Sequence, residues 1–176
     1  MLAASTLASV PGNASAPSGK SWQQILANRL PLYGHRNWIV IADSAYPAQS
    51  RSGIETVVSG ADHFDVLKSA LEAISASRHV RPVVFQDQEL KFVPEQDAPG
   101  VENCRRQLAS ILKNASVNVL PHEEIIHKLD QAGETFEILI IKTNLTIPYT
   151  TVFLQLDCAY WPSDAEKRLR EAMAAH

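Results

Sequence analysis

The sequence predicts an α/β fold, a layered domain in which helices flank a mixed, largely parallel sheet. Two observations lead to this prediction. Apolar, β-branched runs such as WIVIA (38–42) and FEILIIKT (136–143) have the continuous hydrophobicity of strands that are buried on both faces. Segments whose apolar residues recur at helical spacing alternate with these runs, which is typical of folds built on parallel strands.

Length and composition indicate one domain. The chain has 176 residues, of which 45% are hydrophobic and 20% are charged, enough for one core and little more. We expect a flexible tail over residues 1–20, which are rich in Ala, Ser and Pro, followed by a single domain over 21–176. That domain would include a C-terminal helix from about residue 162.

The first half of the domain contains two helices and two strands with recognisable boundaries. Ser21 and Gln24 have the spacing of a capping box and begin a helix that runs to Leu30. The strand WIVIA follows, and a second short strand is predicted from Ile54. Asp62 has the position of an N-cap for the next helix, over 61–75.

The second half continues the alternation. RPVVFQD (81–87) and ELKFV (89–93) are predicted to be extended. The remaining predicted elements are helices over 100–114, 121–132 and 163–176, with Pro121 at the first helical position, and strands over 117–120, 136–143 and 150–157.

The charge pattern excludes several classes of partner. A formal net charge of −3 and a pI of about 6.1, with no basic stripe, argue against nucleic acid. No apolar run approaches the roughly 20 residues of a membrane span. Cys104 and Cys158 lie far apart in the sequence, so we expect two free thiols. We expect a cytoplasmic protein, with export as the alternative that the Ala/Ser/Pro-rich start leaves open.

The motifs do not predict a cofactor or a metal. A dinucleotide site requires a glycine-rich turn after the first strand, whereas this chain has Asp43-Ser44-Ala45-Tyr46-Pro47 there. His122 and His127 in HEEIIH are five residues apart, so they do not share the helical face of a zinc-binding pair. We therefore expect no cofactor and no metal ion.

Two strand ends carry candidate site residues. Asp43 closes WIVIA, and His122 begins a helix directly after VNVL; ligands of open α/β sheets bind at the carboxyl ends of strands. Asp43 is equally consistent with an Asx-type turn or a helix cap. His35, before the first strand, is by itself equally consistent with an exposed loop histidine.

Together, the Gly34-His35 pair, the strand WIVIAD and the late segment IPYTTVFLQLDCAY (147–160) resemble the family of D-ribose pyranase and L-fucose mutarotase. The similarity extends from about Ser21 to Tyr160. It implies the fold of that family and a cofactor-free interconversion of the anomers or ring forms of a monosaccharide, fucose-like or ribose-like.

The resemblance also implies roles for individual residues. His35 matches the proton-donating histidine, and the sugar-binding positions match Asp43, His122 and Tyr149. Thr151, which stands where the family has asparagine, is a fourth expected substrate-binding residue, and Asn37 stands where the family has an acid. A threonine hydroxyl is shorter than an amide, although it also donates and accepts.

Chain geometry sharpens this expectation. His35 and Asp43 are eight positions apart with a strand between them, so they lie on the order of 20 Å apart at about 3.3 Å per residue. A single sugar cannot contact both in one chain. We therefore predict sites at subunit interfaces in a ring-like homo-oligomer such as a decamer, which the resemblance also implies.

The sequence leaves two functions open. The leading hypothesis is a monosaccharide mutarotase or pyranase-like isomerase with His35 as general acid and base. The alternative is a non-catalytic carbohydrate-binding or assembly-forming relative that has kept the fold.

Overall fold

The computed structural model describes residues 21–175, so the predicted tail over 1–20 lies outside the described residues. These residues form a six-stranded sheet in the order β2-β5-β1-β6-β3-β4. The strands are β1 (Trp38–Ala42), β2 (Ile54–Val58), β3 (Val80–Asp87), β4 (Val117–Leu120), β5 (Ile138–Lys142) and β6 (Val152–Cys158).

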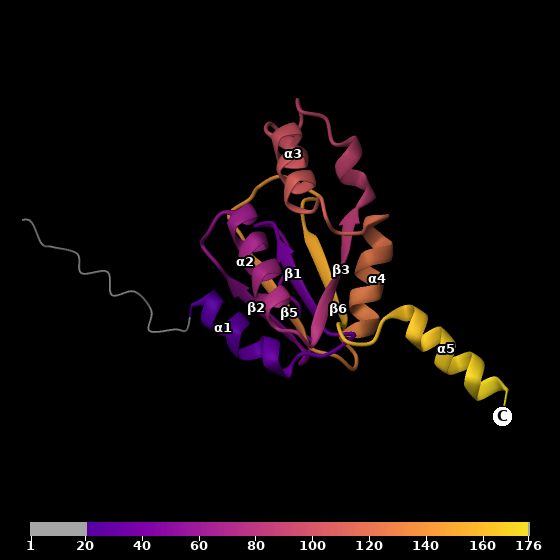
Figure 1. Ribbon diagram of the computed structural model, residues 1–176. Helices are drawn as coiled ribbons and strands as arrows, with labels where there is room; N and C mark the ends of the chain where they lie inside the picture. Colours follow the sequence, from indigo (N-terminus) through magenta and orange to yellow (C-terminus); the bar gives the residue numbers. More distant parts are fainter. Residues whose placement is uncertain (1–20, 176) are drawn as a thin grey trace, which may run out of the picture.

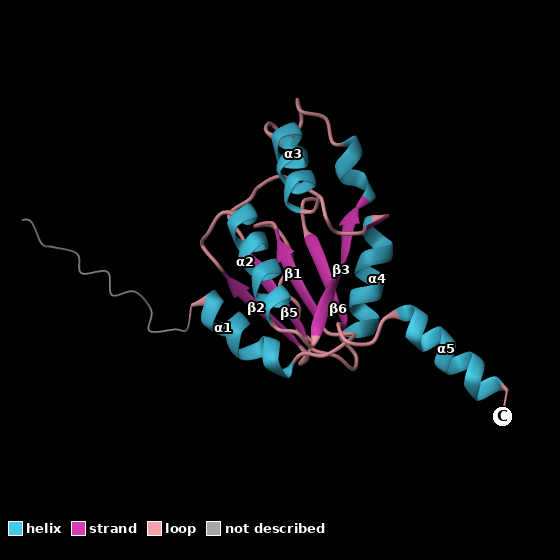
Figure 2. Ribbon diagram, in the orientation of Figure 1, coloured by secondary structure: helices cyan, strands magenta, loops and turns pink. Residues whose placement is uncertain are grey.

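Strand β6 is the exception to a parallel sheet. It runs antiparallel to both of its neighbours, β1 and β3, whereas β1, β2 and β5 pair in parallel, as do β3 and β4. The carboxyl ends of the other five strands therefore lie at the same edge as the start of β6. Figure 2 shows the arrowheads of β1 and β3 at this common end.

Helices cover both faces of the sheet (Figure 1). Alternation along β1 directs Ile39 and Ile41 to one face and Trp38 and Val40 to the other. The helices are α1 (Trp22–Arg29), α2 (His63–Ala76), α3 (Val101–Ile111), α4 (His122–Ala132) and α5 (Ser163–Ala174), with short 3-10 helices η1 (Leu30–Leu32) and η2 (Gln88–Phe92).

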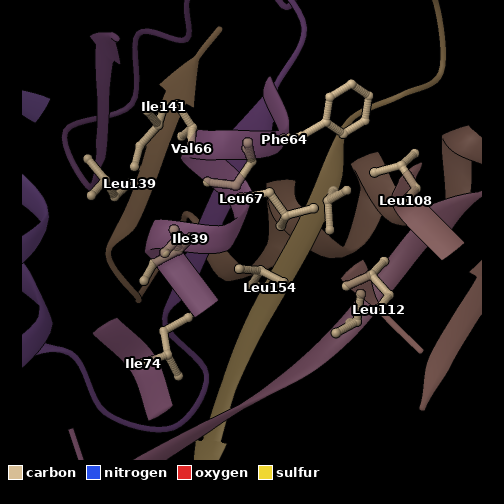
Figure 3. Packing of buried hydrophobic residues seen from close by; sticks show 14 of the residues in the cluster. Ile39, Phe64, Val66, Leu67, Ile74, Leu108, Leu112, Leu139, Ile141 and Leu154 are labelled. Atoms are coloured by element: carbon tan, nitrogen blue, oxygen red, sulfur yellow. The ribbon is translucent and has the colours of Figure 1, made fainter. Parts of the chain in front are cut away.

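Two apolar clusters hold the layers together. Helices α1, α2 and α3 pack on one face, where Leu67 and Ile74 of α2 belong to the same cluster as Ile39 of β1 and Leu154 of β6 (Figure 3). Helix α4 covers the opposite face with Ile125 and Leu129. This arrangement confirms the predicted layered fold with a mixed, largely parallel sheet.

Helix α5 stands apart from these layers. None of its residues is buried, and it extends away from the body of the domain (Figure 1). Side-chain pairs along the helix, Arg168 with Asp164 and Arg170 with Glu166, have N···O distances of 2.7 Å. No helix within residues 21–175 is long and apolar enough to span a membrane.

One predicted element was wrong, and several predicted boundaries differ from the observed ones by one to three residues. ELKFV is not extended, because η2 occupies residues 88–92. The Arg105 guanidinium donates a hydrogen bond to the Leu90 carbonyl at 3.0 Å and another to the Val93 carbonyl, a long-range support that local alternation does not reveal. Pro121 is the N-cap of α4 rather than its first residue. The capping box of Ser21 and Gln24 is confirmed.

Substitution of a central core residue tests this packing. Phe153 of β6 is fully buried, and its ring lies 6.4 Å from that of Tyr46. We expect Phe153→Ala to lower the free energy of unfolding by about 3–5 kcal/mol, because it leaves a cavity between the sheet and α4. Val58→Ala, at an edge position that is 74% exposed, should change the free energy of unfolding by less than about 0.5 kcal/mol. Urea titration of both variants measures the two changes. Equal effects of the two substitutions would contradict the assigned core.

Candidate functional site

The polar residues of the site gather at the edge where five strands end and β6 begins. Asp43 follows β1, Asp87 ends β3, and His122 follows β4 after Pro121. Tyr149 precedes β6, whose reversed direction places its start at this edge. The strand directions alone therefore bring together residues that lie up to about a hundred positions apart in the chain.

Asp43 is held in one orientation by three hydrogen bonds. The Thr151 hydroxyl donates to Asp43 Oδ2 at 3.0 Å and accepts from the Asp43 backbone N–H at 3.4 Å. Asp43 Oδ1 accepts from the Ala45 N–H at 2.9 Å, which is the Asx-type turn that the sequence allowed. Asp43 is half-buried. Its carboxylate forms this turn, and Asp43 also lines the adjacent cavity.

A cavity of about 520 Å³ opens beside Asp43, a volume in the range of small-molecule sites. It lies between the loop after β1, the start of α4 and the loop before β6. The lining residues are Asp43, Ser44, Ala45, Tyr46, Pro47, Gln49, His122, Glu123, Ile126, Thr146, Ile147, Pro148 and Tyr149. Most of this wall is apolar, with a few polar groups that could orient a ligand.

Tyr149 and His122 face each other across one side of this cavity. Their rings meet edge to face, with centroids 5.6 Å apart and planes at 80°. Tyr149 has a φ of 60°, a left-handed conformation that costs a non-glycine residue on the order of 1 kcal/mol. The hydroxyl of the next residue, Thr150, donates to the Ile147 carbonyl at 2.7 Å and stabilises this turn.

Two carboxylates lie close to His122, and one of them accepts hydrogen bonds from its backbone. Its backbone N–H donates to the Glu89 carboxylate at 3.0 and 3.1 Å. Its Nδ1 lies 3.2 Å from Oδ1 of Asp87, although the orientation falls short of a well-aligned hydrogen bond and neither atom has another partner among the described residues. The Asp87 side chain is 1% exposed and that of His122 is 32% exposed.

Burial shifts the ionisation of Asp87 and Tyr46. Burial raises the pKa of Asp87 to about 6, although the adjacent His122 opposes the shift, while Glu89 and Asp43 add to it. Burial also raises the pKa of Tyr46 well above its ordinary value, with the negative charges of Asp87 and Asp130 acting in the same direction. The Tyr46 hydroxyl is therefore neutral, and the carboxyl group of Asp87 titrates close to the physiological range.

A second histidine, His63, lies buried below this edge at the start of α2. Its Nδ1 is 3.0 Å from the Thr143 hydroxyl, which donates to the Ala42 carbonyl at 2.9 Å. Burial lowers the pKa of His63 to about 4, so the neutral ring is the form that the fold favours. The neutral His63 ring therefore contributes to the free energy of unfolding fully above about pH 6.5, and this contribution declines as the pH falls toward 4. His63 thus links α2 to the ends of β1 and β5.

Comparison with known proteins places the chain in a family. The sequence model of the RbsD / FucU transport protein family matches residues 22–159. The chain belongs to this family. No curated protein sequence matches it.

Solved structures of the family share the fold at low identity. Bacillus subtilis RbsD complexed with D-ribose is 21% identical, with a TM-score of 0.56 over 81% of this chain and 98% of that one. Fucose mutarotase from Streptococcus pneumoniae in complex with L-fucose is 18% identical, with a TM-score of 0.50 over 74% and 89%. FucU from Bifidobacterium longum is 18% identical, with a TM-score of 0.52 over 76% and 93%. Helix α5 lies beyond the span that the family model matches.

Three of the residues predicted from the sequence lie together at this edge of the sheet, and two, Thr151 and His35, do not line the cavity. Asp43, His122 and Tyr149 line it. Thr151 is 2% exposed and lies behind Asp43 rather than on the cavity wall.

His35 lies at the other end of β1. It is exposed, and it lines a separate cavity of about 350 Å³ with Cys158 and Trp161. Its loop is held by Asn37, whose Oδ1 accepts from the Gly34 N–H at 2.8 Å and whose Nδ2 donates to the Glu137 carbonyl at 3.2 Å. Asn37 therefore shapes the turn that carries His35.

Sequence reasoning missed Asp87, Glu89 and His63 as residues of this edge. Asp87 had the same signal as Asp43, an acid at the end of an apolar strand. Within residues 21–175, no group of three or more His, Cys, Asp or Glu side chains could hold a metal ion.

The buried Asp87 carboxylate predicts a stability change with a definite pH dependence. Because folding raises the pKa of Asp87 from about 3.8 to about 6, the native state is favoured with the proton bound, and this advantage is lost as the pH rises through 6. Asp87→Asn removes the buried charge. We expect it to raise the midpoint of thermal unfolding at pH 8 by roughly 3–6 °C, and the gain to shrink toward pH 4.

Asp130→Asn is the matched control, because it removes a carboxylate from the half-buried part of α4 at a position outside the cavity wall. It should leave the pH dependence of the midpoint unchanged. A gain from Asp87→Asn that is the same at pH 4 and pH 8 would contradict the assignment of a raised pKa to Asp87.

Proposed function

We propose that this chain is a cofactor-free monosaccharide isomerase, a mutarotase or pyranase that interconverts the anomers or ring forms of a fucose-like or ribose-like sugar. The observation that carries the proposal is the convergence of Asp43, His122 and Tyr149 on one cavity in a chain of the RbsD / FucU family. Two neighbours in fold are complexes with sugars, D-ribose in one and L-fucose in the other.

The reaction requires a base and an acid but no redox partner. Ring opening removes the proton of the anomeric hydroxyl and adds one to the ring oxygen, and ring closure reverses both transfers. Histidine serves as either partner near neutral pH. The Asp43 carboxylate can accept hydrogen bonds from sugar hydroxyls, and the Tyr149 ring offers an apolar face and a phenol.

His35 takes part in such a site only from a second chain. It lies at the opposite end of β1 from Asp43, on the order of 20 Å away along the strand. We therefore propose a ring-like homo-oligomer in which His35 of one copy completes the Asp43 cavity of the next, acting on a cytoplasmic sugar. The exposed position of His35 is compatible with such a contact.

One observation favours the alternative, a non-catalytic carbohydrate-binding relative. The Thr151 hydroxyl already donates to and accepts from Asp43, and it is buried, so it offers no contact to a ligand in the cavity. Binding without turnover would result if the remaining contacts did not align the sugar.

Anomer exchange measured by saturation-transfer NMR on a panel of aldoses separates these functions. We expect the wild-type chain to accelerate exchange for at least one aldose, and His35→Ala to lower that rate by about 100-fold or more, because general acid–base groups contribute about 10²–10⁴. Saturation transfer from protein to sugar without faster exchange would support the binding alternative instead.

Mixing of inactive chains tests the shared site. His35→Ala and Asp43→Ala should each be inactive alone. After co-refolding, an equimolar mixture should regain activity, since some cavities then combine an intact His35 with an intact Asp43. The wild type should also elute as an oligomer in size-exclusion chromatography with light scattering. A fully active monomer, or a mixture without recovery, would contradict the interface.

A further inference from the structure

Asp87 has surroundings that the fold alone does not require. Its carboxylate is almost completely buried, and neither oxygen has a hydrogen-bond partner among the described residues. A buried, unpaired carboxylate is costly, and burial raises the pKa of Asp87 to about 6 for this reason. The nearest cationic candidate is the imidazole of His122, 3.2 Å away.

This contact gives the two ring nitrogens of His122 different roles. An ionised carboxylate only accepts hydrogen bonds, so Asp87 favours the tautomer with the proton on Nδ1. Nδ1 is enclosed, whereas Nε2 is not among the buried atoms and makes no hydrogen bond with any described residue. In that tautomer, the lone pair of Nε2 is free on a ring that lines the cavity.

The position of the His122 ring is further restricted. Glu89 accepts the His122 backbone N–H at 3.0 and 3.1 Å, and the Tyr149 ring lies edge-on at 5.6 Å. The His122 ring is therefore confined by the Asp87 carboxylate, by its own hydrogen-bonded backbone and by the Tyr149 ring. Catalytic contacts of this kind often tighten when substrate binds, so the imperfect alignment in the unliganded chain is compatible with a working pair.

We propose that Asp87 and His122 form an acid–base dyad within a single chain, in which His122 is a catalytic residue and Asp87 is a positioning residue. The inference rests on the proposed isomerase function and goes beyond it. It assigns a proton-transfer role to His122, which is otherwise expected only to bind the sugar, and it adds the Asp87 carboxylate as the group that orients the ring.

Ring opening in this dyad involves two proton transfers. His122 Nε2 takes the proton of the anomeric hydroxyl, the O–H electron pair forms the C1=O bond, and the C1–O5 pair leaves as O5 accepts a proton from the imidazolium of His35 of the adjacent copy. The His122 imidazolium that forms is stabilised by the Asp87 carboxylate. Closure of the ring onto either face of C1 reverses each transfer, so no group is consumed.

The charged surroundings suit this role. Besides His122, the groups that act on Asp87 are the carboxylates of Glu89 and Asp43, and Asp87 in turn acts on the buried phenol of Tyr46. All of these are anionic or neutral, so none of these groups opposes a positive charge on His122. A positive charge on the ring is thereby favoured in the transition state.

The test compares Asp87→Asn, His122→Gln and the double variant with wild type, using the aldose that the wild type exchanges fastest. We expect Asp87→Asn to lower kcat about 10- to 100-fold with KM changed less than about twofold, since the sugar contacts remain. The double variant should be no slower than His122→Gln alone, because the two residues act through one ring. Asp130→Asn should retain the wild-type rate.

A spectroscopic measurement reports on the dyad without any sugar. In ¹⁵N NMR spectra above pH 8, wild-type His122 should be mainly the Nδ1–H tautomer, and Asp87→Asn should increase the Nε2–H form, since an amide can donate to Nδ1. A wild type that exchanges no aldose would refute the proposed isomerase function. An active wild type with unchanged kcat and unchanged tautomer in Asp87→Asn would refute the dyad alone.

Discussion

The complete burial of β1 is the constraint on which the rest of this structure depends. All five of its residues are buried, β5 pairs with one edge, and β6 pairs with the other. A strand in this position cannot tilt or slip, because a shift of one residue would exchange the sets of side chains that face α2 and α4. The residues that precede and follow β1 are therefore fixed at opposite edges of the sheet, and any chemistry that uses both must involve a second copy.

The single antiparallel strand determines which residues meet. If β6 ran parallel to its neighbours, Tyr149 and Thr151 would start at the far edge, beside His35. Because it is reversed, Thr151 lies against Asp43, and Tyr149 lies against His122. The candidate site is thus a consequence of topology, and the side chains need few additional contacts to hold it.

Most of the fold and part of the site could be predicted from the sequence. Continuous apolar runs identified the buried strands, and Asp43 and His122 followed from their position at strand ends. ELKFV shows the limit of such reasoning. Its alternating pattern imitates a strand, but Arg105, more than ten residues away, holds Leu90 in a 3-10 turn. That misassignment concealed Glu89, whose partner His122 lies over thirty residues further along the chain. Asp87, in contrast, closed a predicted strand and was overlooked although it had the same signal as Asp43.

Thr151 shows how a change of residue can preserve one part of a site while reducing another. The resemblance leads one to expect an asparagine there, and an amide could support Asp43 while it reaches toward a ligand. The shorter hydroxyl makes two hydrogen bonds to Asp43 and is enclosed. The orientation of Asp43 is therefore retained, whereas a ligand in the cavity would meet other groups of the wall, such as Ser44, Gln49 and Glu123.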